Sequence, residues 1–129
     1  MIKEYKTHWS IPENIGYFIS SNEKGYSRNQ YKYANFSFNV GDKENAVESN
    51  INDLKNLYSI DNIAFMNQLH TNKTKELIYY KNYTNTDGIF TRNKKIACAV
   101  LTADCIPLLV TDKLGTFIGC IHAGWRGLK

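Results

Sequence analysis

The feature that most constrains this fold is an almost wholly apolar segment at residues 96–102, near the C-terminal end of the sequence. A strand that is apolar at every position is typical of a sheet covered on both faces. Two shorter apolar runs follow at residues 108–111 and 117–121, with a turn signal at residues 113–115 between them, and they predict a β-hairpin. This part of the chain is therefore expected to form layered β-structure.

Upstream of this segment, the pattern predicts one clear helix. Val47, Ile51, Leu54 and Leu57 recur at spacings of four, three and three, which places them on one face of a helix. Asp42 precedes this helix and can cap it, because its carboxylate can accept an otherwise unpaired backbone N–H. Many strands beside one helix indicate an α+β fold, with mixed β-sheets flanked by helices in layers. Further strands are predicted at residues 15–21, 36–40, 63–66 and 76–80, and turns at Asp87-Gly88 and 93–95.

Composition and charge argue against several classes of protein. The length of 129 residues fits one domain, and the net charge of +4 with scattered Lys and Arg gives no reason to expect a nucleic-acid partner. No apolar run approaches the roughly 18 residues of a transmembrane helix, and the first residues lack the apolar core of a signal peptide. The three cysteines show no disulfide spacing, which favours the cytoplasm. Cys98 and Cys120 are interpreted as core residues.

Reactive side chains occur where the predicted strands end. Cys105 follows the apolar segment 96–102, and His122 closes the second strand of the predicted hairpin. Because a hairpin returns its two ends to the same edge of a sheet, Cys105 and His122 can meet in space. His70 follows the short strand predicted at residues 63–66 and is a third candidate for the same site.

Two chemistries use a thiol and an imidazole placed in this way. In the first, His122 polarises the Cys105 thiol, which becomes a nucleophile. In the second, His70, Cys105 and His122 bind a metal ion, and zinc accepts both imidazole nitrogen and thiolate sulfur. Three protein ligands leave one tetrahedral position open, as in catalytic rather than structural zinc sites. The residues alone leave both chemistries open, because their spacing is not that of a zinc finger.

Neighbouring residues allow both a functional and a structural interpretation. Asp104 is either a solvated loop carboxylate or the acceptor that orients an imidazole. Arg126 and Trp125 either bind an anionic or aromatic substrate or pack against the fold. Gly124 and Gly127 would let backbone N–H groups approach a bound oxyanion or phosphate.

Four motifs together resemble the laccase-domain family, once called multicopper polyphenol oxidoreductases and now often purine nucleoside phosphorylases. The resemblance covers roughly residues 15–129, and an upstream pattern that includes Asn35 agrees with it. The motifs occur in the family's order and are Asn67-Gln68-Leu69-His70, Asp87-Gly88-Ile89-Phe90-Thr91, Thr102-Ala103-Asp104-Cys105-Ile106-Pro107 and His122-Ala123-Gly124-Trp125-Arg126-Gly127.

The resemblance implies a fold, a set of site residues and an activity. The fold is a layered α-β-β-α sandwich related to cysteine hydrolases, and the activity is phosphorolysis or adenosine-deaminase-like deamination of purine nucleosides. The implied partners are therefore a nucleoside and phosphate. The implied metal ligands are His70, Cys105 and His122, the implied catalytic residues are Cys105, His122 and Asp104, and the implied substrate-binding residues are Arg126, Asn35 and Gln68.

The resemblance also carries alternatives. Some bacterial members are described as peptidoglycan editing factors, which hydrolyse a wrongly incorporated amino acid from a cell-wall precursor. The laccase label implies copper and phenol oxidation; two histidines and a cysteine can hold Cu²⁺ in place of Zn²⁺, but a laccase needs several copper sites and this chain has three histidines.

Members of that family continue well beyond their Trp-Arg-Gly motif. Residues 1–129 are therefore expected to form a single laccase-type domain, truncated at its C-terminus relative to the family, with an incomplete sandwich. Exposed strand edges in such a form would favour a homo-oligomer. An inactive or scaffolding remnant is the non-enzymatic alternative.

Overall fold

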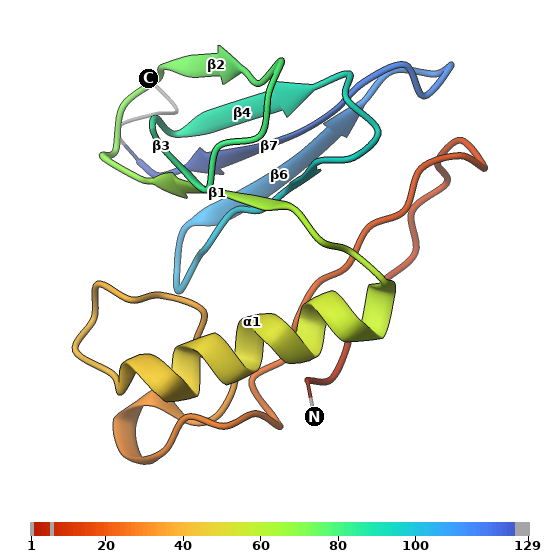
Figure 1. Cartoon of the computed structure of the whole chain (residues 1–129). Helices are drawn as coiled ribbons and strands as arrows, with labels where there is room; N and C mark the ends of the chain where they lie inside the picture. The colour runs from red at the N-terminus through yellow and green to blue at the C-terminus, as the bar shows by residue number, and fades with distance from the viewer. Residues whose placement is uncertain (1, 6, 126–129) are drawn as a thin grey trace. The chain divides into compact units, whose positions relative to one another are not determined.

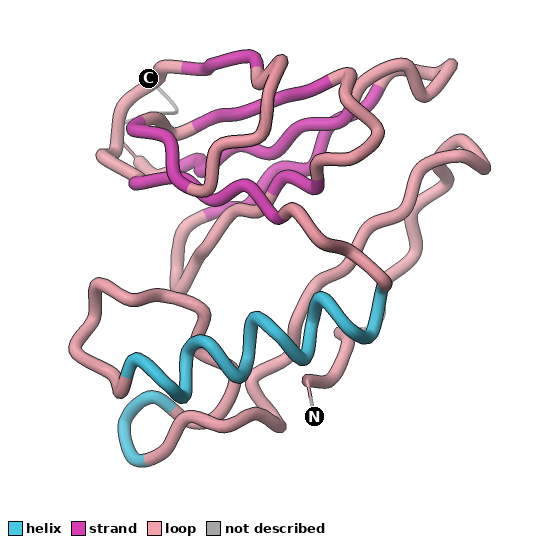
Figure 2. The backbone as a smooth tube through the Cα atoms, viewed as in Figure 1, coloured by secondary structure: helices cyan, strands magenta, loops and turns pink. Residues whose placement is uncertain are grey.

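The computed structural model describes residues 2–5 and 7–125, and the chain divides into two compact units. The first unit comprises Met1–Ser10 and Gly16–Ile60, and the second comprises Ile11–Ile15 and Asp61–Lys129. The first contains the helix and long loops, whereas all the named β-strands belong to the second (Figures 1 and 2). The candidate metal ligands lie in the second unit.

The first unit is built on α1 (Glu44–Tyr58), with a short 3₁₀ helix, η1 (Asn29–Tyr31), before it. The predicted helix is confirmed, and Val47 and Ile51 are buried on its inner face. The buried face of α1 is shorter than predicted, because Leu57, which was expected on it, is 50% exposed. The N-cap position is Lys43 and not Asp42, whose Oδ1 accepts the Lys43 N–H at 2.8 Å.

The two strands predicted in the first unit are wrong. Residues 15–21 form only an isolated bridge between Glu4 and Ser20, and residues 36–40 form irregular backbone, a turn and a bend. The Asn35 side chain accepts the Ser37 N–H at 3.0 Å and donates to the Ser37 carbonyl at 3.1 Å. Such local side-chain contacts compete with a strand ladder for the same backbone groups.

A three-stranded parallel sheet in the second unit has the order β3-β1-β5, from β3 (Tyr83–Asn85), β1 (Ile63–Asn67) and β5 (Ala97–Cys98). β1 confirms the strand predicted at residues 63–66. β5 is much shorter than the predicted strand, and the segment after it is half-buried and not covered on both faces. The backbone of Leu101 pairs with the side chain of Gln68 at 2.6 and 2.8 Å.

A four-stranded sheet has the order β2-β4-β7-β6 (Figure 1). The predicted hairpin is confirmed, because β6 and β7 pair antiparallel from Ile106↔Ala123 to Thr111↔Ile118. The strand predicted at residues 76–80 is shifted toward the N-terminus: β2 (Thr74–Glu76) shares only Glu76 with it and pairs parallel to β4, and Tyr79 is 84% exposed. The strands are β2 (Thr74–Glu76), β4 (Gly88–Thr91), β6 (Ile106–Thr111) and β7 (Ile118–Ala123).

The apolar core of this unit combines residues from both sheets. Cys120 in β7 is fully buried and Cys98 in β5 packs against the same cluster, which confirms the interpretation of both as core residues. Burial raises the pKa of Cys98 to about 12 and also raises that of Cys120. The buried members of the cluster are Ala64, Met66, Leu77, Ile89, Ile96 and Cys120.

The predicted fold class is confirmed, since the structure is mixed α+β, with two β-sheets and one α-helix in the part of the chain that it describes. In the described ranges, no helix combines the length and the apolar character needed to span a bilayer.

Candidate metal centre

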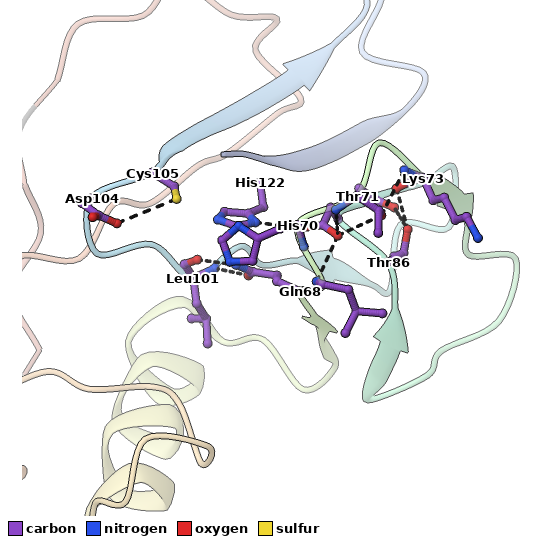
Figure 3. A network of polar contacts seen from close by, with 12 residues as sticks. Gln68, His70, Thr71, Lys73, Thr86, Leu101, Asp104, Cys105 and His122 are labelled. Atoms are coloured by element: carbon purple, nitrogen blue, oxygen red, sulfur yellow. Dashed lines mark hydrogen bonds and ion pairs between the residues drawn. The ribbon is translucent and has the colours of Figure 1, made fainter. Parts of the chain in front are cut away.

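Three potential ligands, far apart in the sequence, converge at one end of the second unit. One ligand atom from each of His70, Cys105 and His122 lies within 4.8 Å of the others. His70 is in the loop after β1, Cys105 immediately precedes β6, and His122 is in β7. Figure 3 shows the Cys105 sulfur and the two imidazole rings facing the same space. The convergence predicted from the sequence is therefore present.

The β6–β7 hairpin accounts for two of the three positions. Its register places Pro107 opposite His122 and Ile106 opposite Ala123. Cys105 comes directly before the first paired residue, so that it lies at the same end of the hairpin as His122. Antiparallel pairing fixes this arrangement through backbone hydrogen bonds, whichever side chains the neighbouring positions carry.

The two imidazoles pack edge to face, with ring centroids 4.9 Å apart and an interplanar angle of 75°. His122 is 5% exposed, and its Nδ1 lies 2.8 Å from Oδ2 of Asp87, which is 1% exposed. With Nδ1 held by a carboxylate, Nε2 of His122 is the nitrogen that remains for a ligand.

Asp87 is the site residue that the sequence analysis missed, because the Asp87-Gly88 pair was interpreted as a turn and as part of a family motif, and no role at the site was assigned to it. Burial acts to raise the pKa of Asp87, but hydrogen bonds from His122, Thr71 and Leu69 outweigh burial and lower the pKa to about 2. The carboxylate is therefore ionised beside His122 at neutral pH. The sequence signals for Asp87 were its position just before a strand and its place in one of the four family motifs. Neither reveals this role without the knowledge that this strand pairs with the one that carries His122.

Asp104 is exposed and lies on the outer side of Cys105, with its Oδ1 3.8 Å from the Cys105 sulfur. Desolvation and the Asp104 charge both raise the pKa of the Cys105 thiol. Of the two interpretations of Asp104, the one as the acceptor that orients an imidazole is replaced by Asp87. Its predicted catalytic role remains a prediction.

Gly124 leaves space beside two of the candidate ligands. A Cβ at this buried position would lie 3.1 Å from Nδ1 of His70 and 3.6 Å from the Cys105 sulfur. The first of these separations is closer than ordinary van der Waals contact, so a larger residue would push against His70. The glycine therefore keeps the region between the ligands free of a side chain.

The predicted substrate-binding residues have different surroundings. The side-chain amide of Gln68 is paired with the backbone of Leu101, and its donor lies 2.6 Å from the Leu101 carbonyl. Asn35 belongs to the first unit, where its amide contacts Ser37 and Asp42. Arg126 lies outside the described residues. Substrate binding by these three residues remains a prediction.

A pocket of about 210 Å³ borders His122 and Asp87. Ligand-binding pockets usually span about 300–1,000 Å³, so this pocket is not assigned to the substrate. Its other lining residues are Thr71, Asn72, Lys73, Thr74, Leu108, Ile121 and Ala123.

The residues that converge here fit a bound transition metal. Two imidazoles and one thiol form a donor set suited to zinc, and also to copper. One imidazole is oriented by a buried carboxylate, as is usual for metal-bound histidine. Gly124 adds no side chain where the ion would lie. The chemistry of the donor set thus supports a metal centre of three protein ligands.

Comparison with known proteins places this site in a family. The family model described as multi-copper polyphenol oxidoreductase laccase matches residues 16–129. A Haemophilus influenzae protein named purine nucleoside phosphorylase is 34% identical over 122 residues, which cover 94% of this chain and 50% of the relative. Purine nucleoside phosphorylase YlmD of Bacillus subtilis is 29% identical over 140 residues, which cover 98% of this chain and 50% of the relative. The chain therefore spans about half the length of these relatives.

Solved structures also match this chain over about half of their own length. The crystal structure of the Neisseria meningitidis protein NMB0706 matches with a TM-score of 0.85 and 31% identity, over 98% of this chain and 52% of that one. The Bacillus licheniformis protein YfiH shares the fold, with a TM-score of 0.75 and 22% identity over 85% of this chain and 46% of that one. The family-model match and these relatives agree with the motifs found in the sequence, and the chain belongs to the multi-copper polyphenol oxidoreductase laccase family.

Proposed function

We propose that this chain carries the metal centre of a zinc-dependent purine nucleoside phosphorylase that also deaminates adenosine. The observation that supports a metal enzyme most strongly is the convergence of His70, Cys105 and His122 within 4.8 Å. The names of the relatives suggest the reaction class, since they are called purine nucleoside phosphorylases. Phosphorolysis exchanges the purine for phosphate on the ribose, and deamination exchanges the adenine amino group for water.

Two of the three candidate ligands have a defined role in this proposal, and His70 would complete the set. Zinc supplies Lewis-acid polarisation of a substrate oxygen and the activation of water at neutral pH. Cys105 binds as a thiolate, which requires its proton to leave before the metal is held. His122 binds through Nε2, because Asp87 occupies the other ring nitrogen.

Asp104 is the proposed proton carrier of the site. It is exposed and adjacent to Cys105, so substrate and solvent can both reach its carboxylate. In phosphorolysis a proton must reach the departing purine, and in deamination one must reach the departing ammonia. Arg126, Gln68 and Asn35 are proposed as contacts for phosphate and nucleoside.

The first test is metal content together with product formation. Elemental analysis of the purified chain is expected to give one zinc per molecule, and incubation with inosine and phosphate is expected to release hypoxanthine. Cys105→Ser should lose both, because it removes one ligand. Cys98→Ser is the matched control, since that thiol belongs to the core cluster. Absence of zinc from the wild-type chain would refute the zinc proposal, and copper in its place would favour the laccase-type alternative.

A metal-free cysteine hydrolase, including one that edits peptidoglycan precursors, is the second candidate. The same observation supports it, because a Cys105–His122 dyad also requires thiol and imidazole within a few ångströms. The raised pKa of the thiol disfavours it, since the nucleophile must be a thiolate. A chelator separates the two candidates: the zinc enzyme loses activity in its presence and the dyad does not.

We further propose a small-molecule substrate, a cytoplasmic location and self-association. A thiol that serves as a metal ligand must stay reduced, as it does in the cytoplasm. β6 is an edge of its sheet in the described part of the chain, and it exposes Ile106 (52%) and Leu108 (40%). Exposed apolar edges favour strand pairing between copies. Light scattering of the purified chain tests this.

A further inference from the structure

One buried carboxylate contacts the segments that carry two of the three candidate ligands. Asp87 lies at the start of β4, and its oxygens have five hydrogen-bonding contacts. Four of these contacts are with the His70 loop, and the fifth is with the His122 ring. In the part of the chain that the structure describes, no other acidic side chain forms a hydrogen bond or an ion pair with either imidazole.

The His70 loop is folded around Asp87. Three consecutive backbone N–H groups, of Leu69, His70 and Thr71, donate to its carboxylate at 2.9–3.0 Å, and the Thr71 hydroxyl adds a fourth contact at 3.0 Å. His70 has a φ of +59°, in the left-handed region that non-glycine residues rarely adopt. Successive N–H groups that converge in such a turn form an anion-binding concavity, and here the anion is a side chain of the same protein. These contacts hold His70 in its left-handed conformation.

The contact with His122 selects one form of the imidazole ring. An ionised carboxylate only accepts hydrogen bonds, so the Nδ1 that faces Asp87 at 2.8 Å must carry a proton. In the neutral ring, this leaves the lone pair on Nε2. The opposite tautomer would place the Nδ1 lone pair against the carboxylate and a proton on the nitrogen that is to bind the metal.

We propose that Asp87 is a positioning residue that presets two of the three metal ligands before the metal arrives, holding His122 as the Nδ1–H tautomer and His70 in its left-handed conformation. The identity of the metal rests on the proposed function. The prearrangement itself is a property of the metal-free chain, and it can be measured there.

Asp87→Asn is the decisive variant. Its Oδ1 can still accept the N–H groups of Leu69 and Thr71. An amide in place of Oδ2 would no longer accept the His70 N–H, and it would donate to Nδ1 of His122 and favour the Nε2–H tautomer. We expect zinc affinity, measured by competition with a chelator, to fall by about 10–100-fold. Long-range ¹H–¹⁵N NMR of the zinc-free protein is expected to show Nδ1–H in the wild type and Nε2–H in the variant.

Asp61→Asn is the matched control, because it removes the same charge from an exposed position in the same unit. It should leave both the tautomer and the zinc affinity unchanged. A loss of affinity in this control equal to that in Asp87→Asn would overturn the proposal, because net charge would then explain the effect.

The wild-type tautomer decides the question even if Asp87→Asn does not fold. An Nε2–H ring in the wild-type, zinc-free chain would overturn the proposal. An Nδ1–H ring together with no zinc binding would refute the proposed zinc enzyme and still support the positioning role of Asp87. The two proposals can therefore fail separately.

Discussion

At the scale of single residues, the charge of Asp87 has the widest consequences. It is 1% exposed, yet it is ionised because it accepts hydrogen bonds from the His70 loop and from His122. A buried charge that loses such partners is strongly destabilising, so this carboxylate affects the stability of the unit as well as the geometry of its ligands.

The stability of the zinc-free protein should depend on pH through Asp87. Its pKa is lowered from 3.8 to about 2 in the folded state, so the carboxylate stabilises the fold at pH values above its unfolded-state pKa. That contribution, about 2 kcal/mol, is lost as the pH falls through about 4 toward about 2. Urea unfolding of the wild type and Asp87→Asn from pH 2 to pH 7 measures it. We expect the difference between the two to shrink in acid; a constant difference would contradict this prediction.

Gly124 is the second residue whose replacement has a defined effect. In Gly124→Ala, the new Cβ would lie 3.1 Å from Nδ1 of His70 and 3.6 Å from the Cys105 sulfur. Overpacking of this kind costs about 1–3 kcal/mol. If His70 moves away from the ligand position to relieve it, the same energy opposes zinc binding, and zinc affinity is expected to fall by up to about 150-fold. Chelator competition measures the fall. Gly16→Ala is the control, because its Cβ would meet no atom within 4 Å. Equal affinity in the two variants would show that the space beside His70 does not matter.

The convergence of the three candidate ligands could be predicted from the sequence because their residue types are rare and chemically specific. The positions of Cys105 and His122 at the ends of apolar runs also showed that a hairpin could bring them together. Asp87 could not be recognised in this way. Aspartate before glycine is usual in turns, and its role depends on the pairing of β4 with β7, which alternation and composition do not reveal.

At the scale of elements, the predictions were correct where the apolar pattern alone determined the type of element. α1, β1 and the β6–β7 hairpin each have a strong apolar pattern that matches one period. The strand predicted at residues 36–40 did not form, because its alternating apolar residues are not all buried: Phe36 is buried, but Phe38 is 37% and Val40 is 50% exposed. Local contacts of the Asn35 side chain determine that segment instead.

β5 shows a different kind of failure. The apolar segment 96–102 was expected to be one long strand, but only Ala97–Cys98 pairs as β5. The side-chain amide of Gln68 takes both backbone groups of Leu101, at 2.6 and 2.8 Å, and so replaces a neighbouring strand. The same contact anchors the chain shortly before Asp104 and Cys105. The early end of the strand therefore leads directly into the loop that carries a ligand.

At the scale of the whole molecule, the candidate site joins segments of the second unit that are separate in the sequence. The loop after β1 and the two ends of the hairpin contribute one ligand each. An ion bound there would link these segments in the folded state, and it would have no equivalent site in the unfolded chain.

Zinc should therefore raise the free energy of unfolding. For a ligand that binds only the folded state, the increase is about 2.7 kcal/mol when free zinc is at about 100 times its dissociation constant. Calorimetric melting with and without zinc measures the effect, and the melting temperature is expected to rise with zinc concentration. Cys105→Ser should abolish this dependence, whereas Cys98→Ser should retain it. A melting temperature independent of zinc in the wild-type chain would contradict the prediction.

The parallel pairing of β2 with β4 bears on the order in which this unit folds. Asp87 immediately precedes β4, and β4 lies between β2 and β7. The carboxylate therefore reaches the His122 ring only after β4 and β7, which are far apart in the sequence, have come together. Pairings between segments far apart in the chain form slowly, because a long loop must close first. We therefore expect the β6–β7 hairpin to form early, with only Cys105 and His122 in place. The full set of three candidate ligands should come together as one of the last events of folding.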